Sequence, residues 1–134
     1  MNAYNANNIF LQIINNKTDS IKVYLDEEVL VIMDAFPQKP GHMLAIPKKE
    51  SRNILDIDNI SLNKLILVVK KIAKAQMKAF NASGVKIAHN CESTAGQIVF
   101  HTHIHVIPYF EEGHAMPNSL DTLEKQALEV AKHI

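Results

Sequence analysis

The chain has 134 residues, of which 47% are hydrophobic and 21% charged, a composition that fits one folded domain and excludes a disordered chain. Lysine and arginine together number 14, as do aspartate and glutamate, so the net charge gives no general reason to expect a nucleic acid or a membrane surface as partner. The single cysteine, Cys91, excludes an internal disulfide and a cysteine-based zinc cage.

The first part of the chain is predicted to contain a short helix and three strands. Ile9 to Ile14 is a short apolar segment typical of a short helix. Lys22 to Asp26 and Val29 to Asp34 are rich in Val, Ile and Leu and flank an acidic turn, as two strands of a hairpin would. After a loop with two prolines and a glycine, His42 to Pro47 is the next predicted strand.

The second part contains the longest predicted helix. From Ser61 to Phe80, apolar residues recur at helical spacing and lysines take the other positions, so we expect one buried and one solvated face. Val85 to His89 and Ile98 to Pro108 are predicted strands, and apolar residues spaced from Leu120 to Ala131 predict a short final helix. This order predicts a single α+β domain over residues 1–134, with a mainly antiparallel sheet of about five strands, one long helix and short terminal helices.

The chain shows no sign of a signal peptide or of a membrane span. Met1 to Asn8 is polar and rich in asparagine, and no long apolar run follows it. Together with the unpaired Cys91, this predicts a cytoplasmic protein.

Three of the seven histidines lie within five residues, at positions 101, 103 and 105. On a regular strand alternate side chains share a face, so the three imidazoles are expected on one face and the intervening side chains in the core. The intervening residues are Thr102, Ile104 and Val106.

Three interpretations of these histidines compete. A surface strand that happens to be rich in histidine would need no function. Three histidines at every second position beside a Gly-Gln loop, however, rarely occur by chance. In a zinc site, neighbouring rings would share one ion, but the outer two are about 13 Å apart along a strand, and two histidines would need a third ligand such as His42. The remaining interpretation is nucleophilic catalysis by an imidazole.

A neutral imidazole can attack phosphorus and form a covalent phosphohistidine. Its other ring nitrogen must be held by an acceptor, so that the attacking nitrogen keeps its lone pair. The charge that develops on the phosphoryl oxygens also needs hydrogen-bond donors. A central histidine with one histidine on each side meets these needs.

Residues 101–107, HTHIHVI, resemble the motif of the histidine triad (HIT) family, in which histidines alternate with apolar residues. Asn90 and Gly96-Gln97 stand where that family has an Asn and a Gly-Gln. Residues 34–48 resemble its Asp-x-x-Pro and Gly-His-x-Leu-x-Ile-Pro-Lys segments, and Ile9-Phe10 fits its N-terminal pattern. The resemblance covers about residues 8–110, in order.

The resemblance implies a protein that binds nucleotides and cuts at the α-phosphate. It makes His103 the nucleophile that becomes transiently nucleotidylated. His101 would orient His103 or support its charge, and His105 would contact the phosphate and assist the leaving group. His42 matches a fourth, more distant histidine that backs the triad.

The resemblance also implies binding roles around these histidines. Gln97 would bond the phosphate region and Asn90 would line the same pocket, although each could instead close a turn. Asp34 would accept hydrogen bonds from the ribose hydroxyls, or else cap the following loop. The residues expected around the base, two of which could equally be plain core, are Ile9, Phe10 and Ala35.

The chain departs from the family pattern at several positions. Ile98 stands beside the phosphate where many relatives have a Ser or Thr donor, and Tyr109 stands where many bacterial relatives have an Arg. Asn90 favours the Hint-like or general bacterial branch over the Fhit-like one. No metal or cofactor is expected, because a histidine nucleophile needs none when His, Gln and backbone donors meet the phosphate charge. The N-terminal cysteines that hold a structural zinc in some relatives are also absent. The histidines that match no role, and are expected to be ordinary surface or half-buried residues, are His89, His114 and His133.

The sequence therefore predicts a nucleotide-binding hydrolase of purine nucleoside phosphoramidates, that is of AMP or GMP derivatives, acting through a nucleotidyl-histidine. A dinucleoside polyphosphate hydrolase is one alternative, and a nucleotide-binding or scaffold protein with weak activity is the other. The resemblance also implies a homodimer with the helix from Ser61 to Phe80 near the two-fold axis, and neither a nucleic acid nor a membrane as partner.

Overall fold

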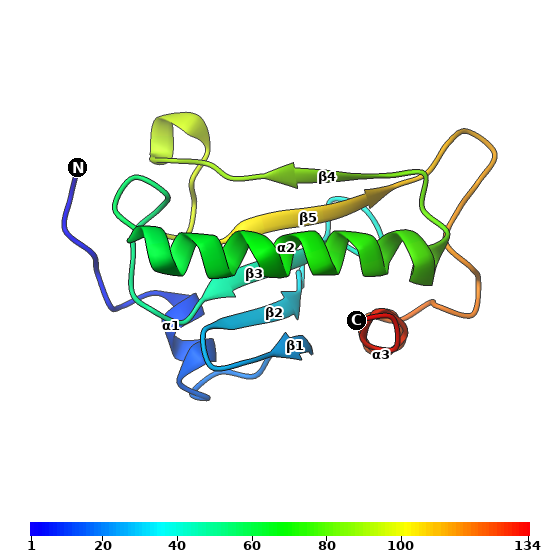
Figure 1. Ribbon diagram of the computed structural model, residues 1–134, viewed down its shortest axis with the longest axis horizontal. Coiled ribbons are helices and arrows are strands. Elements are labelled where there is room, and N and C mark those ends of the chain that lie inside the picture. The colour runs from blue at the N-terminus through cyan, green and yellow to red at the C-terminus, as the bar shows by residue number, and fades with distance from the viewer.

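A computed structural model describes all of residues 1–134. Five antiparallel strands form one sheet in the order β1-β2-β3-β5-β4, and three α-helices pack around it (Figure 1). The predicted α+β class, the five-stranded sheet and the one long helix are confirmed. In chain order the elements are α1 (Ile9–Ile14), β1 (Lys22–Leu25), β2 (Val29–Met33), β3 (Met43–Pro47), α2 (Asn59–Phe80), β4 (Gly84–Ala88), the 3-10 turn η1 (Ser93–Ala95), β5 (Ile104–Tyr109) and α3 (Leu123–Ala131).

The long helix α2 lies across one face of the sheet (Figure 1). It begins at Asn59, two residues earlier than predicted, because the Asp58 carboxylate caps it and accepts a hydrogen bond from the Ser61 N–H at 2.8 Å. It ends at Phe80, where Asn81 adopts the left-handed conformation.

The main core lies between α2 and the sheet. Leu65, Val69 and Ile72 of the helix belong to a cluster of 19 buried residues, which also includes Val130 of α3. The five lysines of α2 are all exposed, as predicted, but so are Ile66 and Met77, two of the apolar residues whose helical spacing predicted the buried face. No helix combines the length and the apolar composition that crossing a bilayer requires.

The opposite face of the sheet is only partly covered. The short helix α1 places Phe10 and Ile13 against this face. The strand residues of this second, smaller cluster are Leu30, Ile32, Leu44 and Ile46. Because α1 has only six residues, part of the face remains open.

The last strand differs from the prediction. β5 begins at Ile104, six residues after the expected start at Ile98. The Thr102 N–H donates to the Ser51 carbonyl at 2.8 Å, and the hydroxyls of Thr102 and Ser51 are also hydrogen-bonded to each other. The segment around Thr102 therefore bonds to the loop before α2 and not to a strand. The expected common face for the three histidines is therefore wrong, and only His105 lies on the strand.

Candidate active site

A pocket of about 700 Å³ opens between α1 and the uncovered part of the sheet. The ladder pairs Ile32 with Leu44 and Leu44 with His105, and residues paired across strands share a face. The pocket floor is therefore apolar, with the His105 imidazole at one end. Such a volume is typical of small-molecule sites.

Most of the predicted site residues line this pocket. His101 and Gln97 do not, and lie behind it. The predicted residues that the structure brings together are Ile9, Phe10, Asp34, Ala35, His42, Asn90, Ile98, His103 and His105.

The imidazole of His103 is fixed in one orientation. Its Nδ1 lies 2.7 Å from the main-chain carbonyl oxygen of His101, and its ring meets the Phe10 ring edge-on with the centroids 4.8 Å apart. A carbonyl oxygen only accepts, so Nδ1 holds the proton and Nε2 keeps its lone pair. This is the state that a nucleophilic imidazole needs.

His42 and His105 form a second fixed unit. The Gln38 N–H donates to Nδ1 of His42 at 3.1 Å, so the His42 proton is on Nε2. That Nε2 lies 2.9 Å from Nδ1 of His105 and 3.4 Å from a carboxylate oxygen of Asp34. Neutral His105 therefore has its N–H on Nε2, and its ring centroid lies 5.1 Å from that of His103.

Asp34 caps its loop with one carboxylate oxygen and leaves the other on the pocket side. One carboxylate oxygen accepts a hydrogen bond from the Phe36 N–H at 2.8 Å, so the residue does cap its loop. The other oxygen remains on the pocket side near His42. It is the group available to a ligand hydroxyl.

His101 acts through its main chain. Its Nε2–H donates to the Pro47 carbonyl at 2.7 Å, and its Nδ1 accepts from the Tyr4 hydroxyl at 2.6 Å. The ring is wholly buried away from the pocket. Its expected influence on His103 therefore passes through the carbonyl oxygen.

Gln97 holds the loop that follows β4. Its Nε2 donates to the Arg52 and Val99 carbonyls, and its Oε1 accepts from the Glu92 N–H and the Asn53 amide, at 2.7 to 3.1 Å. The whole hydrogen-bonding capacity of the amide is used in this way. In this structure the side chain therefore closes the loop, which is the alternative expected for it, and has no group free for a phosphate.

The same loop is held by an ion pair that the sequence did not reveal. Arg52 Nε and Nη2 donate to the two carboxylate oxygens of Glu92 at 2.7 and 3.0 Å, which lowers the pKa of Glu92. Glu92 adopts a φ of +74°, unusual for a residue with a side chain. The two residues are 40 positions apart, and no motif marks either.

A fifth histidine also belongs to the site. His89 was given no role from the sequence, yet its Nδ1 lies 2.8 Å from the His103 carbonyl oxygen. The only available signal was its position next to Asn90.

Burial keeps the imidazoles neutral. It is the largest influence in each case and lowers the pKa of His42, His101 and His105. It lowers the pKa of His103 to about 4, against the opposing effect of the hydrogen bond to the His101 carbonyl, while neighbouring imidazoles lower it further. At neutral pH the His103 ring is therefore neutral, with a proton on Nδ1 alone.

Asp34, His42 and His105 could be considered as metal ligands, since one ligand atom from each lies within 4.8 Å of the others. However, the Gln38 N–H occupies Nδ1 of His42, so the proton of that ring is on Nε2. Nε2 is the atom that would have to bind the metal. The arrangement therefore favours hydrogen bonding between these groups over metal binding.

Together, the fold and the site define a small α+β protein with a buried, neutral imidazole at the edge of an apolar pocket. The HIT domain profile matches residues 15–112. The chain therefore belongs to the HIT family.

Solved and curated relatives agree with this family. The crystal structure of a Hit-like protein of Bartonella henselae, described as involved in cell-cycle regulation and holding an unknown ligand, has 43% identity and a TM-score of 0.90 over 98% of this chain and all of its own. A HIT-like protein of Borreliella burgdorferi is 43% identical over 77% of this chain and 76% of its own. The adenylylsulfatase HINT3 of Arabidopsis thaliana is 33% identical over 75% of this chain and 51% of its own.

Proposed function

We propose that this protein hydrolyses purine nucleoside phosphoramidates, AMP or GMP derivatives, through a nucleotidyl intermediate on His103. The observation that carries the proposal is the tautomer of His103, because the carbonyl of His101 holds the proton on Nδ1 and leaves Nε2 free in the pocket. The apolar residues of α1 and the pocket floor supply a surface for the base. Asp34 supplies an acceptor for the ribose hydroxyls.

The reaction has two steps on the α-phosphorus. In the first, the bond from His103 Nε2 to phosphorus forms and the bond from phosphorus to the leaving nitrogen breaks. That nitrogen takes a proton from Nε2 of His105, whose ring takes up a solvent proton with the anionic substrate, and departs as an amine or as ammonia. In the second, water attacks phosphorus, the bond from phosphorus to His103 Nε2 breaks, and a proton from the water goes to His105 Nε2 in place of the one given to the leaving nitrogen. His105 is placed to pass this proton, since its Nε2 is the ring nitrogen not bonded to His42.

The charge of the pocket favours a neutral leaving group over a polyphosphate. None of the 21 lining residues is a Lys or an Arg, and the two carboxylates among them are Asp19 and Asp34. The extra phosphates of a dinucleoside polyphosphate would find no cation there. Phe36 and Ile98 line the pocket and are 89% and 87% exposed, which places apolar side chains at its open side.

The protein is also proposed to form a homodimer through α2 and β4. Ile60 and Leu67 on α2 are exposed, and so is Ile87 on β4, which is an edge strand of the sheet. An exposed apolar edge of this kind favours pairing with a second copy. This homodimer does not bear on the chemistry of His103.

The test compares adenosine 5′-phosphoramidate with diadenosine polyphosphate as substrates, for wild type, His103→Gln and His114→Gln. His114 is an exposed histidine outside the pocket and serves as the matched control. We expect His103→Gln to lose at least about a thousandfold in turnover and His114→Gln to behave as wild type. Wild type quenched in alkaline detergent, where the bond between phosphorus and the imidazole nitrogen survives, should contain a nucleotidyl group on the peptide that includes His103.

Three results would contradict this assignment. Undiminished turnover in His103→Gln would exclude the covalent mechanism. Faster cleavage of diadenosine polyphosphate than of adenosine 5′-phosphoramidate would favour a dinucleoside polyphosphate hydrolase. Tight AMP binding without turnover of either substrate would favour a nucleotide-binding protein.

A further inference from the structure

The main chain of the proposed nucleophile lies outside the sheet. The ladder between β4 and β5 ends at the pair Ala88 and His105, and the ladder between β3 and β5 ends at Ala45 and Ile104. His103 therefore comes one residue before the first paired residue of β5. Its carbonyl oxygen has no strand partner.

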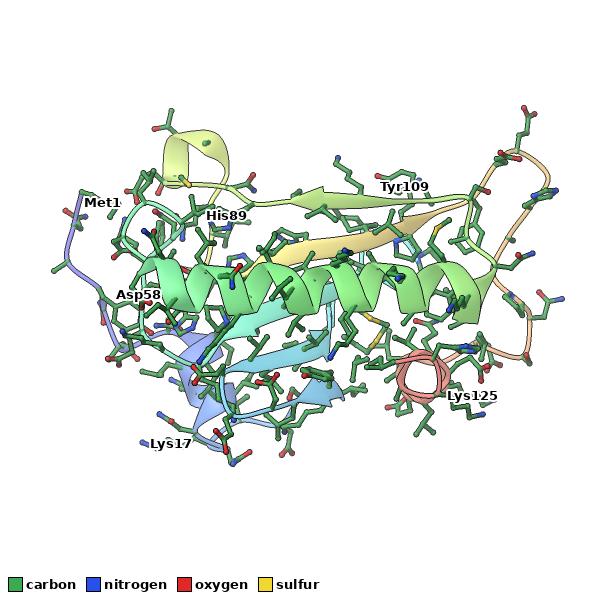
Figure 2. The ribbon with its side chains drawn as sticks, in the orientation of Figure 1. Met1, Lys17, Asp58, His89, Tyr109 and Lys125 are labelled. Carbon is green, nitrogen blue, oxygen red and sulfur yellow. The ribbon has the colours of Figure 1, made fainter.

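A side chain takes the place of that missing partner. His89 follows directly after β4, as Figure 2 shows, and its Nδ1 lies 2.8 Å from the His103 carbonyl oxygen. The opposite ring nitrogen, Nε2, accepts from the Ile54 N–H at 3.0 Å. One contact needs a donor and the other an acceptor, so the ring is neutral with its proton on Nδ1.

His89 itself does not reach the reacting atoms. It is half-buried and is not among the residues that line the pocket. Its ring centroid lies 6.5 Å from that of His103, in an edge-on arrangement. Its one hydrogen bond to the nucleophile is therefore the contact with the main chain of His103.

We propose that His89 is a positioning residue for the nucleophile, whose Nδ1–H holds the His103 carbonyl where a strand N–H would otherwise do so. With that carbonyl held and Ile104 fixed in the sheet, the Cα–Cβ bond of His103 has one direction. The ring then meets the His101 carbonyl with Nδ1 and the pocket with Nε2. This inference rests on the proposed role of His103 as nucleophile.

The test uses two variants of the same shape. In His89→Asn, the amide nitrogen occupies the place of the ring Nδ1 and can still donate to the His103 carbonyl, whereas His89→Leu has the same branching without a donor. We expect His89→Leu to lose about tenfold in kcat for adenosine 5′-phosphoramidate with KM unchanged. We expect His89→Asn to keep most of the wild-type kcat.

A spectroscopic readout makes the test independent of the substrate. The ¹⁵N shifts of the His103 ring, recorded without ligand, should report the Nδ1–H tautomer in wild type and in His89→Asn, and a mixture of tautomers in His89→Leu. If the protein does not act on phosphoramidates, the proposed function fails while these shifts still test the contact.

Several outcomes would overturn the inference. One is a His89→Leu variant with wild-type kcat and tautomer. Another is a His89→Asn variant that loses as much as His89→Leu, because the donated hydrogen bond would then not be the cause. A His89→Leu variant that fails to fold would make the residue structural and would also overturn it.

Discussion

Each imidazole of the site has one nitrogen bound to a group whose role is fixed. Carbonyl oxygens accept from His101 and His103, and a main-chain N–H donates to His42. The proton positions follow from these contacts alone, without any ligand. The free lone pair on His103 is therefore built into the unliganded protein.

The first prediction concerns the pH dependence of kcat/KM, which reports the free enzyme. Burial lowers the pKa of His103 to about 4, so the ring remains a nucleophile well below the ordinary value of 6.5. We expect kcat/KM for adenosine 5′-phosphoramidate to stay level from about pH 7.5 to about pH 5.5, where an ordinary histidine would cost about tenfold. Spontaneous acid hydrolysis of the substrate is subtracted at each pH. An acid limb centred on the ordinary value would contradict a buried, neutral nucleophile.

For the individual residues, the sequence predicted which histidines lie together in the site, but not the hydrogen-bond partners that fix each side chain. Local pattern and resemblance placed His103, His105 and His42 together, because they lie in short, recognisable segments. The contact of Tyr4 with His101 joins residues 97 positions apart, and that of His89 with His103 replaces a strand bond. Such contacts depend on how loops meet in the folded chain, so no local pattern encodes them.

Among the elements, α2 supports the site from the far side of the sheet. Gln76 is wholly buried, and its Nε2 donates to the Gly41 carbonyl at 3.1 Å and to the Val106 carbonyl at 3.0 Å. These carbonyls belong to the neighbours of His42 and His105. One helix side chain therefore ties together the two segments whose imidazoles share a hydrogen bond.

The second prediction is that Gln76→Met weakens both stability and catalysis. Two buried carbonyls lose their partner, so we expect the free energy of unfolding to fall by about 2 kcal/mol in urea titrations. Loosening the His42–His105 pair should lower kcat about fivefold.

A matched control is available on α3. Gln126 is also buried, donates to one carbonyl, that of Leu120, at 3.0 Å, and like Gln76 has an unpartnered Oε1. Gln126→Met should cost about 1 kcal/mol and leave kcat unchanged. Equal effects of the two variants on kcat would show that Gln76 acts only on stability.

The strand that was predicted too long shows why alternation alone misleads. Histidines take every second position from His101 to His105, with Thr102 and Ile104 between them, which suggests the alternation of a half-buried strand. Yet His101 and Thr102 are both fully buried and neither joins a ladder. The His101 side chain bonds to Pro47 at the end of β3, and the Thr102 N–H bonds to Ser51 in the loop that follows. His101 and Thr102 would point to opposite faces of a strand, yet both are buried by tertiary contacts. The periodicity of this segment therefore does not predict a strand of the sheet. By contrast, α2 has one long apolar stripe, and there periodicity predicted the element to within two residues.

Over the whole molecule, the two faces of the sheet have different tasks. The face under α2 and α3 contains the larger core. The face under α1 contains the smaller cluster and the pocket. Stability is thus concentrated on one side, and the other side can bury several imidazoles whose neutral form the fold must maintain.

That burial makes stability depend on pH, which is the last prediction. Above pH 6.5 the ring of His103 is neutral in both the folded and the unfolded chain, so its full contribution is present. Below this pH the unfolded chain binds a proton, while the folded chain does not until its pKa of about 4. The free energy of unfolding should therefore fall as pH drops through this window, by about 3 kcal/mol from His103 alone.

Urea titrations of wild type and His103→Gln at neutral pH and near pH 4.5 measure how much of the pH-dependent loss in the free energy of unfolding comes from His103. The variant has no proton to bind at position 103, so its stability should decline less on acidification. Exposed His114 again provides the control, and His114→Gln should follow wild type. The same pH dependence in wild type and His103→Gln would mean that the His103 ring is not held neutral by the fold, and the tautomer argument for its reactivity would fail with it.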